Sequence, residues 1–224
     1  MNANKIYVWG DSIAKGVVMD EARGRYRISK ENCLSRLERE SGVEIHNFAV
    51  MGNTSAQGLE RMQAGMPDEG GVAVIEFGGN DCDLDWKAAS EQPEVAQQGK
   101  VPLKAFGENL KRMIACARGA GMEPVLVTPP PIDAERYFRW VSRGLDAANI
   151  LRYLGDVQHI YRWQERYAHA VTAVANRTGA RLIDLRDAFL AETHVDRLLC
   201  ADGIHPNERG YRMMSDVARM ALVQ

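Results

Sequence analysis

Asp202 and His205 are residues whose types and spacing suggest chemistry. They lie three positions apart in the stretch CADGIHPNERGY, residues 200–211, which reads as a loop. An Asp close to a His can orient the imidazole, bind a metal ion or simply lie on the surface. The local sequence leaves all three roles open, although Pro206 and Asn207 are suited to opening a helix directly after the pair.

Three further residues fit a reactive site but are ambiguous one by one. Ser12, in WGDSIAKG, follows an apolar run, and the glycines around it allow a tight turn. A serine in a turn is more often a cap or turn residue than a nucleophile. Gly52, in MGN, and Asn80, in GGND, are also ordinary turn formers. Each residue therefore needs support from the elements that position it.

Five short apolar runs alternate with helical patterns along the chain. Near-continuous hydrophobicity of this kind is typical of strands buried on both faces of a parallel sheet. Alternating strands and helices predict an open parallel sheet covered by helices on both faces. Ligands of such sheets bind in the loops beyond the carboxyl ends of the strands, which is where Ser12, Gly52, Asn80 and the Asp202–His205 pair fall. The five predicted strands are residues 5–10, 44–50, 72–78, 123–129 and 181–185.

Together these residues match the requirements of ester hydrolysis through a serine. That reaction needs a nucleophile, an imidazole to accept its proton, a group that orients the imidazole, and donors for the developing oxyanion. Ser12, His205 and Asp202 would supply the first three. The backbone N–H groups of Ser12 and Gly52 and the side chain of Asn80 would supply the donors.

The sequence resembles the SGNH hydrolases, also called the GDSL esterase/lipase family. Four of the family's blocks are matched in the family's order, so the resemblance covers almost the whole chain, and only the Leu of the first block differs, here Ile13. The blocks are GDSIAKG around Ser12, NFAVMGNTS around Gly52, FGGND around Asn80 and DGIHPNERGY around Asp202 and His205.

This resemblance implies a role for each residue. Ser12 would be the nucleophile and the first oxyanion-hole donor, Gly52 the second and Asn80 the third. His205 would be the general base that later protonates the leaving group, and Asp202 would orient it. The family also implies a flavodoxin-like three-layer α/β/α sandwich with a five-stranded parallel sheet, no metal and no organic cofactor.

Composition and charge narrow the class of protein. The 224 residues are 46% hydrophobic and 26% charged, with a formal net charge of −2, which is ordinary for a soluble globular protein. Without a basic block we expect no nucleic-acid partner, and without an apolar segment of ~20 residues no membrane partner. The N-terminus lacks an apolar signal region, so we expect a cytoplasmic protein acting on a small-molecule or carbohydrate ester.

The chain reads as a single domain, residues 1–224, with two insertions in the simple α/β pattern. Residues 82–101 are acidic and poorly periodic, and residues 132–162 are rich in Arg and aromatic side chains. Both follow predicted strand ends, so we expect them to form a rim or lid of the substrate pocket. Asp81, next to the first insertion, is suited to fixing the loop that carries Asn80.

Two other kinds of site match parts of the sequence but lack residues that they need. The acidic run DCDLDW, residues 81–86, places Asp at alternate positions, but Trp86 and Gln92 stand where a calcium loop needs Gly and Glu. Cys82 and Cys200 lie close to Asn80 and Asp202, but a thiol nucleophile would need its own activating partner. We therefore interpret the acidic run as a solvated rim and both cysteines as packing residues.

The leading hypothesis is a serine esterase that removes short acyl groups, above all acetyl, from a carbohydrate or small molecule through an acyl-enzyme. A lysophospholipase or thioesterase acting on longer acyl chains is the alternative within the same chemistry. A flavodoxin-like binding module without catalysis is the alternative from another class, although GDSIAKG has neither common phosphate-loop spacing.

Overall fold

One five-stranded parallel sheet forms the centre of the protein. A computed structural model describes residues 5–223, so residues 1–4 and 224 lie outside the described part of the chain. The expectation that the N-terminus has no signal region concerns residues 1–4 in part and is not addressed there. The sheet order is β4-β1-β5-β6-β7, which is 2-1-3-4-5 when these strands are counted along the chain, the flavodoxin-like order. The strands are β1 (Lys5–Gly10), β4 (Glu44–Asn47), β5 (Gly71–Glu76), β6 (Met122–Val127) and β7 (Arg181–Ile183). This architecture confirms the predicted fold class.

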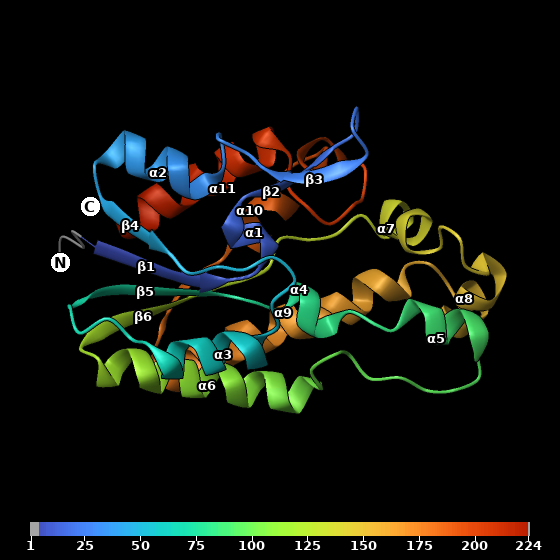
Figure 1. Cartoon of the computed structure of the whole chain (residues 1–224), viewed down its shortest axis with the longest axis horizontal. Coiled ribbons are helices and arrows are strands. Elements are labelled where there is room, and N and C mark those ends of the chain that lie inside the picture. Colours follow the sequence, from blue (N-terminus) through green and yellow to red (C-terminus); the bar gives the residue numbers. More distant parts are fainter. Residues whose placement is uncertain (1–4, 224) are drawn as a thin grey trace.

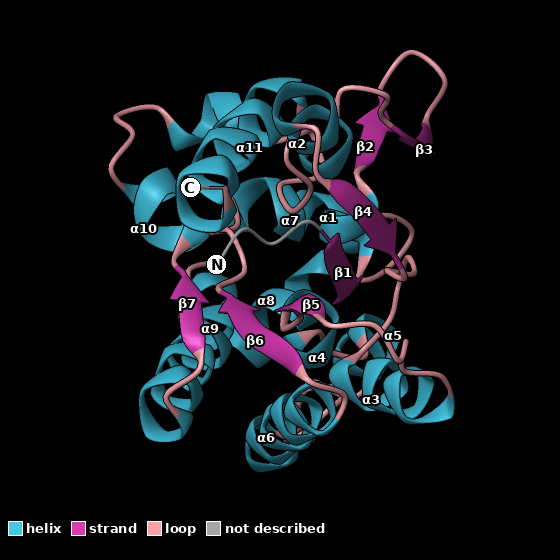
Figure 2. Cartoon of the chain, turned by 90° about the vertical axis from the view of Figure 1, so that its left-hand side faces the viewer, coloured by secondary structure: helices cyan, strands magenta, loops and turns pink. Residues whose placement is uncertain are grey.

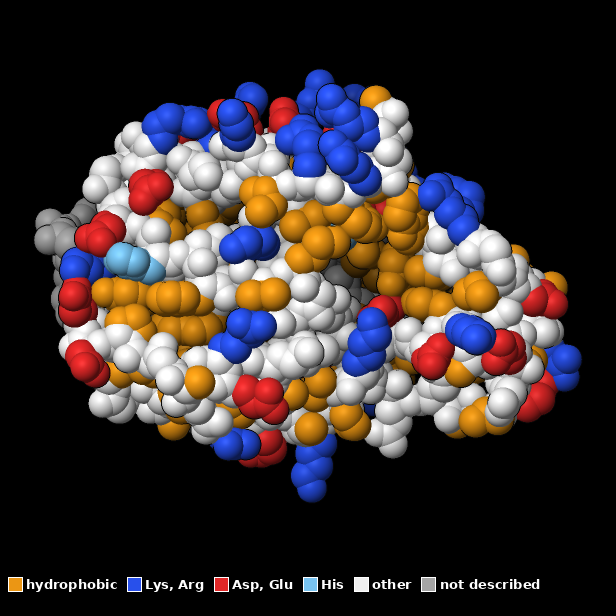
Figure 3. All heavy atoms as spheres, viewed as in Figure 1, with side chains coloured by type: hydrophobic (Ala, Val, Ile, Leu, Met, Phe, Trp, Pro, Cys, Tyr) orange, Lys and Arg blue, Asp and Glu red, His pale blue; other side chains and the backbone are white. Residues whose placement is uncertain are grey.

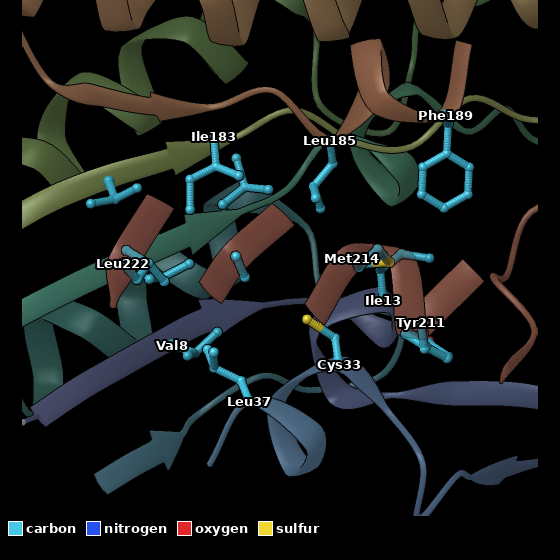
Figure 4. Close-up of a cluster of buried hydrophobic side chains, with 14 of the residues drawn as sticks. Val8, Ile13, Cys33, Leu37, Ile183, Leu185, Phe189, Tyr211, Met214 and Leu222 are labelled. Atoms are coloured by element: carbon cyan, nitrogen blue, oxygen red, sulfur yellow. The ribbon is translucent and has the colours of Figure 1, made fainter. Parts of the chain in front are cut away.

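Helices cover both faces of the sheet because side chains alternate along each central strand. On β1, Ile6 and Val8 belong to one buried cluster, whereas Tyr7 and Trp9 belong to the other. The first cluster packs under α2 (Cys33–Ser41), α10 (Leu185–Leu190) and α11 (Glu208–Leu222). The second packs under α3 (Ser55–Ala64), α6 (Leu103–Gly119) and α9 (His159–Thr178). Figure 2 shows the two helical layers, and Figure 4 the first cluster.

The two edge strands are less buried than predicted, and β7 ends at Ile183, its one fully buried residue, rather than at residue 185. In β4 only part of each side chain is covered, and the strand ends at Asn47 rather than at residue 50. An edge strand has one strand neighbour and needs fewer apolar residues. The chain nevertheless continues beside β1, since the N–H of Phe48 donates to Val8 at 2.8 Å and that of Val50 to Gly10 at 3.1 Å.

A two-stranded antiparallel hairpin follows the first helical turn, α1 (Ser12–Lys15), and the sequence analysis does not predict it. It consists of β2 (Val17–Asp20) and β3 (Arg25–Ile28). In β3 only Tyr26 is partly buried, so no apolar run marks the strand. The Tyr211 hydroxyl donates to the carbonyl of Val17 at 2.7 Å, which ties the hairpin to α11.

The two insertions lie together at one end of the molecule, on the right in Figure 1. The first follows the short helix α4 (Gly79–Cys82) and contains α5 (Trp86–Glu91). The second contains α7 (Ala134–Val141) and α8 (Ala147–Leu154), and a 3₁₀ turn, η1 (Val195–Leu198), lies farther along the chain. Their apolar side chains form a third cluster with the start of α9. Within residues 5–223, we find no helix of the length and apolarity that a membrane crossing needs.

Candidate active site

Ser12 is placed at the carboxyl end of β1 by a tight strand-to-helix turn. The Asp11 carboxylate caps α1 by accepting from the N–H of Ile13 at 2.8 Å. A Cβ on Gly10 would lie 2.6 Å from the Cβ of Ala14 and 2.9 Å from the carbonyl oxygen of Glu76. Only glycine therefore lets the turn pass this close to β5, and Ser12 is held almost fully buried.

The loop that carries Asp202 and His205 is fixed from both sides. Asp202 Oδ1 accepts from the N–H of Ile204 and of His205, both at 3.1 Å. Asn207 caps α11 as the sequence predicts. Gly203 has a φ of +78°, and a Cβ there would lie 2.6 Å from the carbonyl oxygen of Asp133. The N–H of Asp133 in turn donates to the carbonyl of Gly203 at 2.8 Å, which joins this loop to α7.

Ser12, His205 and Asp202 form one hydrogen-bonded chain. His205 Nε2 lies 2.9 Å from Ser12 Oγ, and Nδ1 lies 2.6 Å from Asp202 Oδ2. With its proton on Nδ1, the ring donates to Asp202 and accepts from the serine hydroxyl. Burial opposes charge on Asp202, but the hydrogen bond from His205 holds the pKa of Asp202 below its ordinary value. The structure thus brings together three residues that are far apart in the sequence.

Asn80 joins the same site through Asp11. Its Nδ2 donates to Asp11 Oδ2 at 3.0 Å, and one N–H of the amide remains for another acceptor. The adjacent Asp81 binds the start of α3, accepting from the N–H of Ser55 at 2.9 Å and from its hydroxyl at 2.5 Å. Burial raises the pKa of Asp81 to about 6, although both bonds oppose that shift. Asp81 therefore fixes the loop of Asn80, as the sequence suggests.

Gly52 is exposed in the turn after β4, with a φ of +80° that favours glycine. Its link to the site runs through Val50, whose N–H bonds to Gly10, two residues before Ser12. The Asp81–Ser55 bonds hold the other side of this segment, because α3 begins three residues after Gly52. The turn is thus braced between the loops that carry Ser12 and Asn80.

A pocket of about 810 Å³, including its opening to solvent, lies in front of these groups. Ser12, Asn80 and His205 line its inner end. Its outer part is lined mainly by apolar and aromatic side chains, and these form much of the orange hollow beside the right-hand lobe in Figure 3. Cys82, which the sequence analysis interprets as a packing residue, also lines the pocket, as does His159. Burial raises the pKa of the Cys82 thiol well above its ordinary value, so this group stays a thiol.

The hairpin covers the imidazole ring. The ring of Tyr26 lies 4.9 Å from that of His205 and 5.9 Å from that of Trp140, between ring centroids. The guanidinium of Arg143 lies 4.0 Å from the Trp140 ring on α7. Burial and the charge of Asp202 raise the pKa of Tyr26 well above its ordinary value. The hairpin that the sequence analysis missed therefore shields His205 and Asp202 from water.

Sequence reasoning also missed a pair of buried acids, Asp11 and Glu76, beneath the Ser12 turn. Both line the pocket, and Gly10 pairs with Glu76 across β1 and β5. Glu76 is only 3% exposed, and among residues 5–223 its carboxylate oxygens have no partner that meets hydrogen-bond geometry. Burial and the charge of Asp11 raise the pKa of Glu76 well above its ordinary value. We therefore place the proton on Glu76 and the charge on Asp11, which accepts two hydrogen bonds.

A Glu76→Gln variant is expected to be more stable than the wild type at neutral and alkaline pH. The folded chain keeps this proton to a higher pH than the unfolded chain, whose ordinary Glu pKa is 4.5. The stability contributed by the bound proton is complete below that value and is lost as the pH rises through the raised folded pKa. Glutamine has no such loss, so the gain should exceed about 1 kcal/mol near pH 8 and vanish near pH 4.

Urea unfolding of both proteins at several pH values would measure this gain. The exposed Glu60→Gln variant is the matched control and should leave stability unchanged throughout. A Glu76→Gln effect that is the same at every pH would show that folding does not raise the pKa of Glu76.

Comparison with known proteins identifies the family to which this chain belongs. Residues 8–213 match the model of the GDSL-like lipase/acylhydrolase family. The chain is 23% identical to the isoamyl acetate-hydrolyzing esterase of Saccharomyces cerevisiae, over 96% of this chain and 84% of that protein. It is 30% identical to esterase TesA of Pseudomonas aeruginosa over 145 residues, which is 63% of each protein.

A solved structure supports the fold. The lipase/acylhydrolase from Enterococcus faecalis superposes with a TM-score of 0.69 at 24% identity, covering 97% of this chain and 94% of that one. At this identity the likeness concerns the fold alone, and the family match over residues 8–213 carries the assignment. The chain therefore belongs to the GDSL-like lipase/acylhydrolase family and is an esterase of the SGNH type.

Proposed function

We propose that the protein hydrolyses carboxylic esters with Ser12 as the nucleophile. The observation that carries this proposal is the buried hydrogen-bonded chain from Ser12 through His205 to Asp202, which opens into a pocket. His205 Nε2 accepts the serine proton as Ser12 Oγ attacks the ester carbonyl carbon. Asp202 keeps the remaining imidazole proton on Nδ1 and stabilises the imidazolium that forms.

The oxyanion is held by three N–H groups in this proposal: the backbone groups of Ser12 and Gly52 and the free N–H of the Asn80 amide. Asp11 supports this arrangement by orienting Asn80. When the tetrahedral intermediate collapses, the carbon–oxygen bond to the alcohol breaks and His205 protonates the departing oxygen. Water then attacks the acyl-enzyme with His205 as base, and the carboxylic acid leaves.

The proposed substrate is a short-chain acyl ester of a small molecule or carbohydrate, with acetyl as the expected acyl group. The name of the yeast relative, which states isoamyl acetate hydrolysis, favours an acetyl group. The apolar lining of the outer pocket favours the longer-chain alternative, a lysophospholipase or thioesterase activity. The family match favours an enzyme rather than a flavodoxin-like binding module.

Covalent labelling tests the nucleophile directly. A p-nitrophenyl alkylphosphonate should react once per chain, forming a bond from Ser12 Oγ to phosphorus and releasing p-nitrophenolate. Peptide mass spectrometry should place the added mass on Ser12. A Cys82→Ser control should label equally well, because that thiol plays no part. A label on any other residue, or none, would contradict the proposal.

A further inference from the structure

The outer part of the pocket is built by the two insertions and the start of α9. We call the apolar and aromatic residues that line this part of the pocket the outer wall. They are Leu84, Trp86, Ile132, Tyr137, Leu154, Ile160 and Trp163. In Figure 1, α5 and α8 lie at the end of the molecule farther from α1, where Ser12 lies. The wall is thus a region distinct from the reacting groups but continuous with them.

The polar tips of the wall's aromatic residues are already bound within the protein. Trp86 Nε1 donates to Asp83 Oδ1 at 2.8 Å, and the Tyr137 hydroxyl donates to the same oxygen at 2.7 Å. Trp163 Nε1 donates to the carbonyl of Cys82 at 2.8 Å. These rings therefore present carbon surface to a ligand. Of the polar side chains that line this region, Asp83 and Gln164 are bonded within the protein, and His159 can serve a ligand. A sugar here would therefore regain few of the hydrogen bonds that it loses to water.

The wall is also rigidly assembled. Asp83 joins Trp86 of the first insertion to Tyr137 of the second, and its other oxygen accepts from Lys100 at 2.7 Å. A second link joins the insertions at Ser90, whose hydroxyl accepts from the N–H of Asp146 at 2.8 Å. These bonds are backed by the buried third cluster, which includes Leu154. The subsite is therefore formed before a ligand arrives.

We propose that the outer wall binds an apolar chain of the ester substrate and sets the preferred chain length. The inference rests on the proposed esterase function and adds the chemical class of the group beyond the ester bond. Each methylene that enters the wall should raise kcat/KM about fourfold, which corresponds to about 0.8 kcal/mol. Leu154, which ends α8 and is 4% exposed, is placed to limit the chain.

Two ester series distinguish the acyl part from the alcohol part as the source of this chain. One varies the acyl group from acetyl to dodecanoyl on a constant p-nitrophenol, and the other varies a straight-chain alcohol on a constant acetyl group. A rise in kcat/KM with chain length in either series supports the proposed role of the outer wall. The series that shows the rise identifies whether the acyl group or the alcohol occupies the wall. A flat or falling dependence in both series would overturn the proposal.

Variants of Leu154 test which residue sets the length. Leu154→Phe should lower kcat/KM for the longest good substrate about tenfold while leaving the shortest ester near wild type, and Leu154→Ala should move the optimum to longer chains. Leu151, on the same helix but 40% exposed, is the matched control. Leu151→Phe should change nothing. An unchanged optimum in both Leu154 variants would overturn the assignment of the limit.

Two further measurements keep the test interpretable. Ile132→Phe, from the loop before α7, fills the same wall if the Leu154 variants unfold below the assay temperature. Phosphonate labelling of Ser12 in every variant reports whether the reacting groups are intact. Normal labelling of Ser12 with an unchanged chain-length profile would refute the proposed role of the outer wall but not the esterase function. Failure to label Ser12 in the wild type would refute the proposed function itself.

Discussion

Replacing Ser12 with alanine is expected to lower kcat for a short-chain aryl ester by about 10³-fold to 10⁴-fold or more. The variant loses the Ser12 hydroxyl oxygen that is hydrogen-bonded to His205 Nε2, so no acyl-enzyme forms. The oxyanion donors and the pocket remain, and they account for the small rate that should persist over water. Steady-state kinetics with a p-nitrophenyl ester would measure the loss, with the enzyme concentration calibrated by absorbance.

A second buried serine supplies the control for this variant. Ser215 on α11 is 0% exposed, and its hydroxyl has no hydrogen-bond partner among the described residues. Ser215→Ala removes the same kind of atom from another buried position and should keep the full rate. If Ser12→Ala retained most of the activity, the nucleophile would have to be sought elsewhere in the pocket.

Asp202→Asn is expected to lower kcat by about 10³-fold to 10⁴-fold with little change in KM. The asparagine oxygen can still accept from the N–H groups of Ile204 and His205, so the loop keeps its shape. Its NH₂ group then faces His205 Nδ1 and donates to it. The imidazole proton moves to Nε2, where it faces Ser12, and the ring no longer accepts the serine proton.

The exposed Asp196→Asn serves as the control for the loss of one carboxylate from the same part of the chain. Circular dichroism and thermal unfolding should show both variants folded. A folded Asp202→Asn protein with near-normal kcat would mean that Asp202 does not set the tautomer of His205.

The sequence predicts the sheet and the meeting of Ser12, Asp202 and His205 at its edge because both depend on short-range patterns. The strand predicted over residues 72–78 begins with four consecutive apolar residues, 72–75, all of them buried in β5, and burial on both faces leaves such a run few alternatives. Ser12, Asn80 and His205 each lie directly after a strand or close to a helix start, so the parallel topology alone gathers them at one edge of the sheet.

What the sequence does not predict depends on contacts between distant segments. Glu76 is a charged residue inside an apolar run, a visible signal, but its partner Asp11 is identified only by the register of β1 with β5. The bond between Tyr137 and Asp83 spans 54 residues and requires the two insertions to pack together. The hairpin was missed because β3 exposes three of its four side chains and shows no apolar pattern.

Helix α7 connects the outer wall to the loop that carries His205. Its N-terminus is bonded to the loop of His205 through Asp133 and Gly203, while Tyr137 on the same helix belongs to the outer wall. We therefore expect a substitution that reshapes the wall through α7 to disturb His205, the proposed general base, as well and to slow the turnover of every substrate. Helices α5 and α8 have no such bond to that loop within the described chain. New substrate ranges are consequently easier to evolve or engineer through α5 and α8, with α7 left unaltered.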